Sequence, residues 1–131
     1  NKNILVTGAS RGLGRGIAIK LAEAGFNVAI NYAGNVEAAN ETVKLCKEIA
    51  KDNSQKFMPF QADISVETQR NKMLLEIETN FGVLSGLVNN AGIAPKIRAD
   101  ILEAGEESFL DLIKTNLMAF DNLFMKVDLL I

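Results

Sequence analysis

Four short apolar runs mark the predicted strands of this chain. They cover residues 3–7, 27–31, 56–61 and 84–89. Apolar runs of this length, closed by turn residues, predict strands that are buried in a sheet. Pro59 lies within the third run and cannot donate a hydrogen bond to a neighbouring strand, so we expect that strand at an edge of the sheet.

The segments between these runs show the three- and four-residue spacing of amphipathic helices. The pattern predicts helices over residues 12–24, 36–51 and 66–80, and a further helix from 106 onward. Gly25 ends the first of these helices, and Ser65 is the predicted N-cap of the third. The apolar side of the second helix consists of Ala39, Val43, Cys46, Ile49 and Ala50. Cys46 is therefore predicted to be a small core residue.

Strand and helix alternate four times along the chain. This order predicts an α/β fold with a parallel sheet, right-handed crossovers and helices on both faces. The 131 residues contain no internal repeat, low-complexity segment or linker, so we expect residues 1–131 to form a single domain.

The composition excludes several kinds of site. There is no His and only one Cys, which excludes His-based triads, His metal sites, internal disulfides and Cys-rich zinc sites, and no metal site is predicted. With 14 basic and 16 acidic residues, the net charge of -2 is unlike that of a nucleic-acid-binding protein, so no nucleic-acid partner is expected. No apolar run approaches the ~20 residues that span a bilayer. Together with the absence of a visible targeting segment, this favours a cytoplasmic protein without a membrane partner.

A glycine-rich turn connects the first predicted strand to the first helix, the place where a doubly wound sheet binds a dinucleotide. It reads Thr7-Gly-Ala-Ser-Arg-Gly-Leu-Gly14. Gly8 allows the tight turn, Gly12 lets a pyrophosphate approach the backbone, and Gly14 lets the helix pack close to the strand. The helix N-terminus then offers free N–H groups to the phosphates. The spacing differs from the generic Gly-x-Gly-x-x-Gly pattern, and a plain strand-to-helix connection is the alternative.

Four segments together resemble the classical short-chain dehydrogenase/reductase family over residues 3 to about 119. They are the turn 7–14, Asp63-Ile64 after the third strand, Asn89-Asn90-Ala91-Gly92 after the fourth, and Thr115-Asn116-Leu117 in the last helix. Within the family, residues 31–35 are most similar to the 3-oxoacyl-[acyl-carrier-protein] reductase group. The resemblance implies a Rossmann-type doubly wound parallel sheet with strand order 3-2-1-4. The C-terminal half of that fold is missing from the 131 residues, so the single domain is expected to be incomplete.

The resemblance also implies which residues bind a nicotinamide cofactor. They are Gly8, Ser10, Arg11, Gly12, Leu13, Gly14, Asn31, Tyr32, Ala33, Asp63, Ile64, Asn90, Ala91 and Gly92. The glycine turn would hold the phosphates, and the segment after the second strand would hold the adenosine 2′-phosphate. Asp63-Ile64 would contact the adenine, and Asn90 to Gly92 would lie along the ribose and nicotinamide side. Ordinary structural alternatives stay open: Asp63 as the cap of a turn, Asn90 to Gly92 as a tight turn, and Asn116 as an incidental polar residue.

The end of the second strand favours NADP(H), with NAD(H) as the second choice. An NAD site usually has an acidic residue roughly 20 positions after the glycines, where it binds the ribose 2′-hydroxyl. Here no acidic residue follows the strand until Glu37. Arg11 can pair with a 2′-phosphate through its planar guanidinium; the alternative for Arg11 is a position that only faces solvent.

The resemblance implies an oxidoreductase that transfers a hydride to the carbonyl of a small molecule or an acyl thioester, with a 3-oxoacyl thioester as one candidate. The family uses a Tyr as proton donor, a Lys four residues later, a Ser and an Asn. Only Asn116 stands at a matching position. The single Tyr, Tyr32, ends the second strand, and the residue four positions later is Val36. Because general acid catalysis needs a donor at the developing alkoxide, the 131 residues alone are predicted to be inactive.

Three interpretations remain open. The favoured one is that the chain is part of a longer enzyme. The second is a nucleotide-binding module without catalysis, or a protein completed by a partner at the open edge of the fourth strand. The third is a small-molecule methyltransferase, although that class usually has an acidic residue where this chain has Asn31. The family's usual assembly implies a homo-oligomer, either a tetramer or a dimer.

Overall fold

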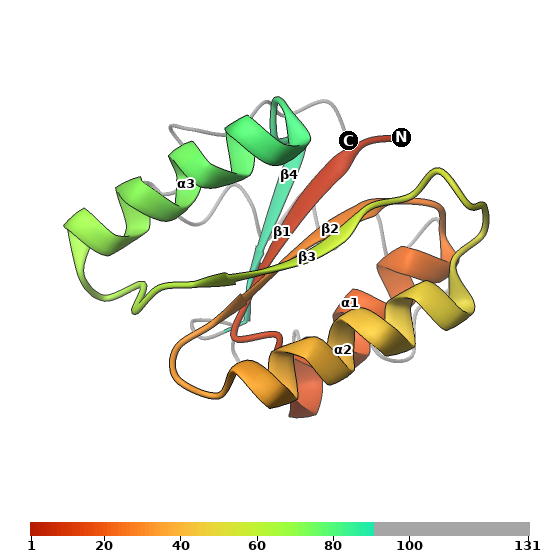
Figure 1. Cartoon of the computed structure of the whole chain (residues 1–131), viewed down its shortest axis with the longest axis horizontal. Helices are drawn as coiled ribbons and strands as arrows, with labels where there is room; N and C mark the ends of the chain where they lie inside the picture. The colour runs from red at the N-terminus through yellow and green to blue at the C-terminus, as the bar shows by residue number, and fades with distance from the viewer. Residues whose placement is uncertain (91–131) are drawn as a thin grey trace.

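The computed structural model describes residues 1–90, in which parallel strands and helices alternate (Figure 1). The strands are β1 (Asn3–Thr7), β2 (Asn27–Tyr32), β3 (Phe57–Gln61) and β4 (Gly86–Asn89). The helices are α1 (Gly12–Glu23), α2 (Val36–Ile49) and α3 (Glu67–Phe81). The α/β class is thus confirmed. The helix predicted from residue 106 lies outside the described residues.

The strands form one sheet in the order β3-β2-β1-β4, which confirms the predicted order. All pairings are parallel: Val6 of β1 lies between Ile30 of β2 and Val88 of β4. β3 pairs with β2 alone among the described strands, with Pro59 opposite Ile30. The edge position predicted from Pro59 is therefore confirmed.

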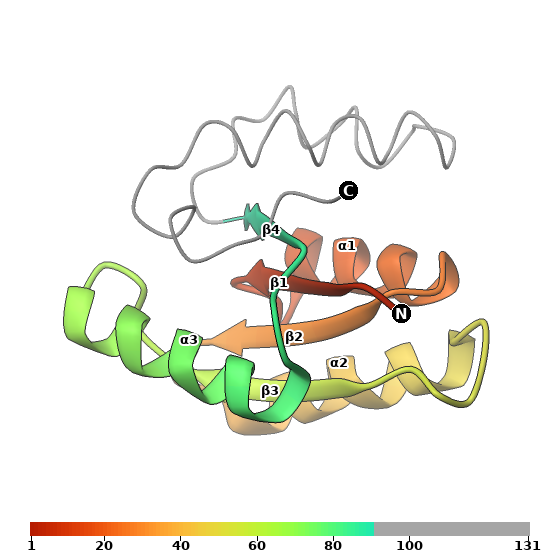
Figure 2. The same ribbon diagram turned by 90° about the horizontal axis from the view of Figure 1, so that it is seen from above.

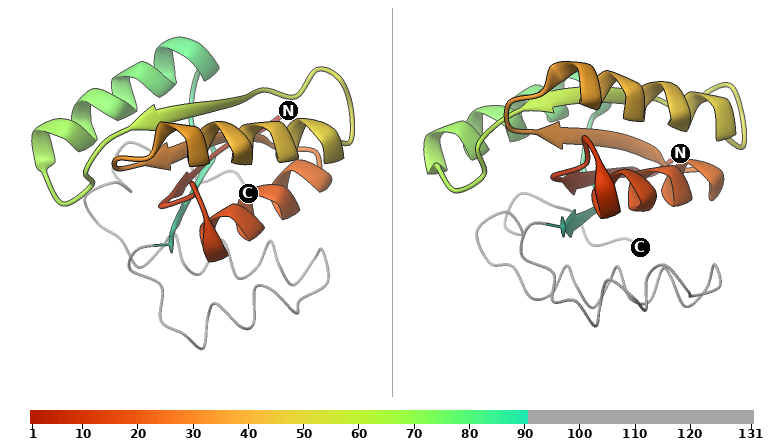
Figure 3. Two further views of the ribbon diagram at one scale, coloured as in Figure 1. Left: turned by 60° about the horizontal axis from the view of Figure 1, so that its bottom comes forward. Right: turned by 90° about the horizontal axis from the view of Figure 1, so that it is seen from below.

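Helices α1 and α2 cover one face of the sheet, and α3 lies on the other (Figures 1 and 2). Cover on both faces buries consecutive residues of each inner strand, as expected for a parallel sheet. In β1, Ile4, Leu5 and Val6 have no exposed surface. α1 and α2 lie side by side on the same face of the sheet (Figure 3). This packing fixes the position of the loop that joins β1 to α1, because α2 lies beside the start of α1.

Cys46 of α2 is part of the core, as its place on the apolar side predicts. Burial raises the pKa of its thiol to about 12, because the thiolate would lose its hydration. None of the helices in the described part of the chain has the length and apolar character needed to cross a membrane.

Two local predictions are wrong. The N-cap of α3 is Val66, which makes no side-chain capping bond. Ser65 instead donates its N–H and its hydroxyl to Asp63 Oδ1 at 3.0 and 2.6 Å, because an ionised carboxylate is the better acceptor in a turn. Ile49 is 41% exposed rather than buried, because α2 ends at this residue. Other element boundaries differ from the predicted ones by a residue or two.

Candidate functional site

The candidate site lies where the carboxyl ends of β2, β1 and β4 meet. The loop after β1 turns back under the sheet into α1, Asn31 lies near the end of β2, and Asn90 follows β4. β1 is the strand at which the chain changes direction in the sheet, since β2 lies on one side of it and β4 on the other. Open α/β sheets bind ligands at this kind of switch point (Figure 2).

The glycines of the turn have the geometry that their predicted roles require. Gly8 and Gly12 have φ angles of 59° and 58°, a region that side-chain-bearing residues rarely occupy. A Cβ on Gly12 would have no atom of residues 1–90 within 4 Å, so the space in front of it is open in this part of the chain. A Cβ on Gly14 would lie 2.1 Å from the carbonyl oxygen of Gly8. Gly12 therefore faces free space, and Gly14 permits the close contact of helix and strand end.

Side chains from both neighbouring strands hold the backbone of Gly8. The Gly8 N–H donates to Asn31 Oδ1 at 3.1 Å, and the Ala9 N–H donates to the Asn31 carbonyl at 2.8 Å. On the other side, Asn90 Nδ2 donates to the Gly8 carbonyl at 3.1 Å. The exit of β1 is thus fixed between β2 and β4.

The side chain of Asn31 lies inside the fold. It is only 3% exposed, and its Nδ2 donates to the carbonyls of Phe60 and Ala62 at 3.3 and 3.1 Å. This placement differs from the predicted contact with a 2′-phosphate, because backbone groups occupy both ends of the amide. The residues of this segment that reach the surface are Tyr32, which is half-buried, and Ala33, which is exposed.

Arg11 is exposed and takes the N-cap position of α1, in extended backbone conformation and without a side-chain capping bond. The first helical hydrogen bond of α1 runs from the Arg15 N–H to the Arg11 carbonyl, at 3.3 Å. The N–H groups of Gly12 and Leu13 precede it and have no backbone acceptor within residues 1–90, so they can bind an anion. The first turn of α1 contains no acidic residue that would repel one.

Asp63 and Ile64 follow β3 at the same edge of the sheet. Asp63 is exposed, and its bonds from the hydroxyl and the N–H of Ser65 lower the pKa of its carboxyl. Its own N–H donates to Gln69 Oε1 at 2.8 Å. Asp63 thus organises the turn before α3, which was the structural alternative for this residue. Ile64 is half-buried against the core.

Two side chains that were not predicted as site residues, those of Arg15 and Thr42, contact the glycine turn. Arg15 donates to the Ser10 carbonyl, and Thr42 donates to the Ala9 carbonyl. Thr42 has no exposed surface although it is polar. A signal was present, because Thr42 stands between Ala39, Val43 and Cys46 on the apolar side of α2, where a buried hydroxyl needs a partner.

Three predicted site residues, Ala91, Gly92 and Asn116, lie outside the described residues. Within residues 1–90 the structure contains no group of three or more His, Cys, Asp or Glu side chains that could hold a metal ion.

Comparisons with known proteins extend these observations. The family model for short chain dehydrogenase matches residues 2–127. The 3-oxoacyl-[acyl-carrier-protein] reductase FabG of Staphylococcus epidermidis is 41% identical over 127 residues, which is 97% of this chain and 50% of that protein. The short-chain dehydrogenase/reductase homolog YusS of Bacillus subtilis is 39% identical over 107 residues, 82% of this chain and 94% of that protein.

A solved reductase structure is also similar to this chain. It is that of the promiscuous reductase LugOII, which catalyses keto-reduction at C1 during lugdunomycin biosynthesis. It is 30% identical, with a TM-score of 0.60 over 91% of this chain and 51% of that one. The chain therefore spans about half the length of LugOII and of the FabG protein.

Proposed function

The chain belongs to the short chain dehydrogenase family, and from this premise we propose that it binds NADP(H) as the cofactor-binding part of a carbonyl reductase. The observation that carries the proposal is the glycine turn at the carboxyl end of β1. There Gly12 faces open space, next to N–H groups at the start of α1. A dinucleotide pyrophosphate is the ligand that such a turn accommodates.

The residues fit a nicotinamide dinucleotide. The open space in front of Gly12 would take the pyrophosphate, since any side chain there would occupy it. Ser10 and Leu13, which are both half-buried, lie on either side of Gly12 in the sequence and would contact the phosphates, and the exposed Asp63 with Ile64 would border the adenine. When bound, the nicotinamide supplies or accepts the hydride. The remaining cofactor contacts would come from Asn90, Ala91 and Gly92.

We propose NADP(H) rather than NAD(H) because of Arg11 and the end of β2. Arg11 is exposed beside the turn, and no described residue forms an ion pair with its guanidinium. Asn31 is neutral and buried, and Glu37, the first acidic residue after β2, lies on α2. A 2′-phosphate would thus meet a cation and no carboxylate at the end of β2.

Two relatives support the proposed reaction and substrate class. FabG is named for the reduction of 3-oxoacyl groups on an acyl carrier protein, and LugOII for keto-reduction. We therefore propose reduction of a small-molecule carbonyl or acyl thioester, with Asn116 as the one catalytic position in these 131 residues. The family's Tyr, Lys and Ser would have to come from further chain. A homo-oligomer remains a prediction from the resemblance, and a cytoplasmic setting remains a prediction from the sequence.

A second candidate is a nucleotide-binding protein without catalysis. The match to YusS favours it, because 94% of that relative is covered by only 107 aligned residues. Family chains of about this length thus occur among the relatives. Membership of the short chain dehydrogenase family removes the reason to consider a methyltransferase.

Calorimetric titration with NADPH and NADH tests the cofactor, and an NADPH oxidation assay with a β-ketoacyl thioester tests the reaction. We expect binding with NADPH preferred. NADH binding that equals or exceeds NADPH binding would refute the cofactor choice. Binding without turnover, in a protein whose intact mass equals that of its complete gene product, would favour the non-catalytic candidate.

A further inference from the structure

We propose that Arg15 and Thr42 are positioning residues that hold the glycine turn in the shape that binds phosphate. They keep two consecutive carbonyls of the turn on the α2 side, so that the N–H groups of Ser10 and Arg11 face the other way. The inference deepens the proposed function, on which it rests in taking the ligand to be the pyrophosphate of a dinucleotide.

The contacts form one connected network. Arg15 Nη2 donates to the carbonyls of Ser10 and Ala38 at 2.7 and 3.0 Å, and its Nε donates to Thr42 Oγ1 at 3.0 Å. The Thr42 hydroxyl donates to the Ala9 carbonyl at 2.9 Å and lies 3.2 Å from the Ser10 carbonyl. Bonds from a charged guanidinium are the stronger kind, and Thr42 is fully buried. The carbonyls of Ala9 and Ser10 are therefore held firmly on this side.

The direction of the two carbonyls also sets the direction of the N–H groups that follow them. In a planar trans peptide unit the carbonyl and the following N–H point in opposite directions, and no peptide bond of the described chain is cis. Fixing the carbonyls of Ala9 and Ser10 toward α2 thus directs the N–H groups of Ser10 and Arg11 away from it. Neither N–H has an acceptor within residues 1–90. Successive N–H groups of this kind form a concave anion site.

The two arginines near the turn have different roles in this arrangement. Arg11 is exposed and makes no described contact with a side chain, so it can reach a ligand. Arg15 is half-buried and uses Nε and Nη2 on the protein itself. Arg15 would act on the ligand only through the turn, whereas Arg11 would act on the 2′-phosphate directly.

The network also links the turn to the segment that would bind the adenosine. Arg15 reaches the Ala38 carbonyl in the first turns of α2, and the Ala38 N–H donates to the N-cap Asn35 Oδ1 at 3.0 Å. Asn35 follows Tyr32 and Ala33 after only one further residue. The phosphate turn and the adenosine segment are thus held in one relative position.

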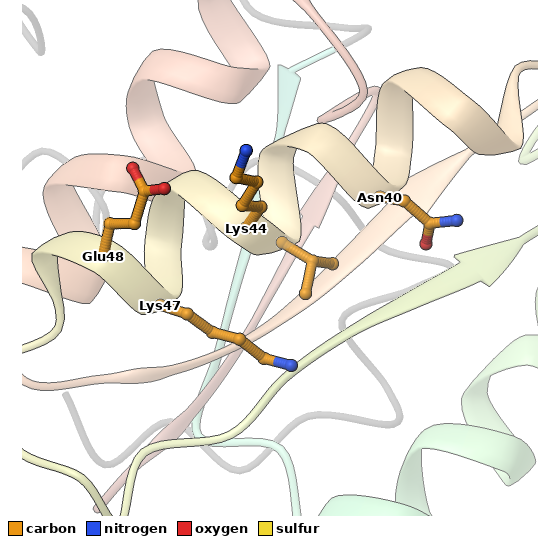
Figure 4. Close-up of a pocket in the computed structure, with 5 residues that line it drawn as sticks. Asn40, Lys44, Lys47 and Glu48 are labelled. Carbon is orange, nitrogen blue, oxygen red and sulfur yellow. The ribbon is translucent and has the colours of Figure 1, made fainter.

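A matched control lies on the same helix. A shallow hollow on α2 is lined by Asn40, Val43, Lys44, Lys47 and Glu48 (Figure 4). Lys44 is exposed, and its side chain forms no hydrogen bond or ion pair with any described residue. Lys44→Gln therefore removes one positive charge from α2, two residues from Thr42, without touching the network.

The test uses the 131-residue chain and two readouts. The first is the affinity for NADPH and for NADH at a temperature where circular dichroism shows each variant folded. Arg15→Gln and Thr42→Val should weaken both nucleotides by about three- to tenfold, the loss expected for one or two hydrogen bonds. The ratio of the two affinities should not change. Thr42→Ser, which keeps the hydroxyl, should bind within about twofold of the parent chain, and so should Lys44→Gln.

The second readout is the amide NMR spectrum during titration with inorganic pyrophosphate. The N–H signals of Ser10 and Arg11 should shift in the parent chain and require more pyrophosphate in Arg15→Gln. Parent-like nucleotide affinity of Arg15→Gln would overturn the proposal, as would a loss confined to NADPH, which would make Arg15 a direct ligand of the 2′-phosphate. If Thr42→Val does not fold, Arg15→Gln decides alone. Binding without turnover by the complete gene product would reject the proposed reductase but not this inference, whereas a parent chain that binds neither pyrophosphate nor nucleotide would reject both.

Discussion

A Cβ placed on Gly14 would lie 2.1 Å from the carbonyl oxygen of Gly8. The neighbouring Gly8 carbonyl carbon and Ala9 Cα lie at 2.8 and 2.9 Å, so three backbone atoms crowd the same point. Backbone cannot rotate out of the way as a side chain can. The first turn of α1 is thus packed against the end of β1 with no room for a methyl group.

Gly14→Ala should therefore destabilise the chain by about 3 kcal/mol or more, at the upper end of overpacking costs. Urea denaturation followed by circular dichroism measures this. Gly34→Ala is the matched control, because a Cβ there would meet no atom of the described residues within 4 Å. It should change the free energy of unfolding by less than about 0.5 kcal/mol. Equal effects of the two substitutions would contradict the packing argument.

Gly12→Ala should weaken nucleotide binding in addition to lowering stability. Its φ of 58° makes a side chain cost about 1–2 kcal/mol, and the new methyl group would occupy the space proposed for the pyrophosphate. We expect nucleotide affinity to fall more than about tenfold, a loss of over ~1.4 kcal/mol. Gly82, with a φ of 90° and equally open surroundings, is the control. Gly82→Ala should lose at least as much stability, because a ψ of -154° at this φ is a conformation that glycine alone commonly adopts, but no affinity. A parallel loss of affinity would show that backbone strain alone explains both.

The elements were predictable from the sequence because they depend on patterns within the chain. The apolar runs form the strands, every residue of β1 is buried, and the edge position of β3 follows from the missing N–H of Pro59. What the sequence could not show is which distant polar groups meet. Arg15 and Thr42 are 27 residues apart, and Asn31 bonds to a carbonyl 31 residues away. A hydrophobic pattern predicts which face of an element is buried, but it does not predict which acceptor a buried amide will bond to.

The residue that caps α3 also could not be predicted from the sequence. Asp63 and Ser65 are both good cap and turn residues, two positions apart, and the pattern alone does not decide between them. The structure shows Ser65 donating to Asp63, so the choice depends on the path of the chain as it leaves β3. For the same reason, the buried position of Asn31 was not visible from its place at the end of a strand.

Arg11→Gln should separate the two nicotinamide cofactors. Loss of a charge-assisted bond to a 2′-phosphate should weaken NADPH binding by about ten- to a hundredfold and leave NADH binding unchanged. Titration at two salt concentrations adds a check, because the NADPH preference of the parent chain should shrink as salt rises. Lys20→Gln, a charge change in the last turn of the same helix, is the control. Equal weakening of NADPH and NADH by Arg11→Gln would contradict recognition of the 2′-phosphate.

Cys46 should make stability fall at alkaline pH. Its thiol pKa rises from its ordinary value of 9.0 to about 12 in the folded chain, because burial disfavours the thiolate. The unfolded chain releases this proton near pH 9, so the contribution is fully present below that pH and is lost as pH rises toward 12. Cys46→Ala should therefore show a shallower decline of unfolding free energy across this window. A thiol reagent at pH 8 should label the parent chain in urea but not when it is folded; rapid labelling of the folded chain would contradict the burial.

Asn31→Asp tests whether the end of β2 faces the nucleotide or the fold. The substitution keeps an acceptor for the Gly8 N–H but removes the donor to the carbonyls of Phe60 and Ala62, and places a carboxylate against them. In a site only 3% exposed this should cost about 3 kcal/mol at neutral pH. Burial and the facing carbonyls should raise the pKa of the introduced carboxyl above its unfolded value. The cost should therefore be smallest below that value, where the protonated acid can donate, and should grow as pH rises through the folded pKa.

Asn35→Asp is the matched control for this substitution. Asn35 is an exposed N-cap that only accepts, from the Ala38 N–H at 3.0 Å, and Asp caps a helix as well as Asn does. Urea denaturation at pH 4 and pH 7 should show a loss that depends on pH for Asn31→Asp and almost none for Asn35→Asp. If Asn31→Asp unfolds like the parent chain and binds NADH more tightly, its side chain faces the ribose, and position 31 selects the cofactor directly instead of holding Gly8.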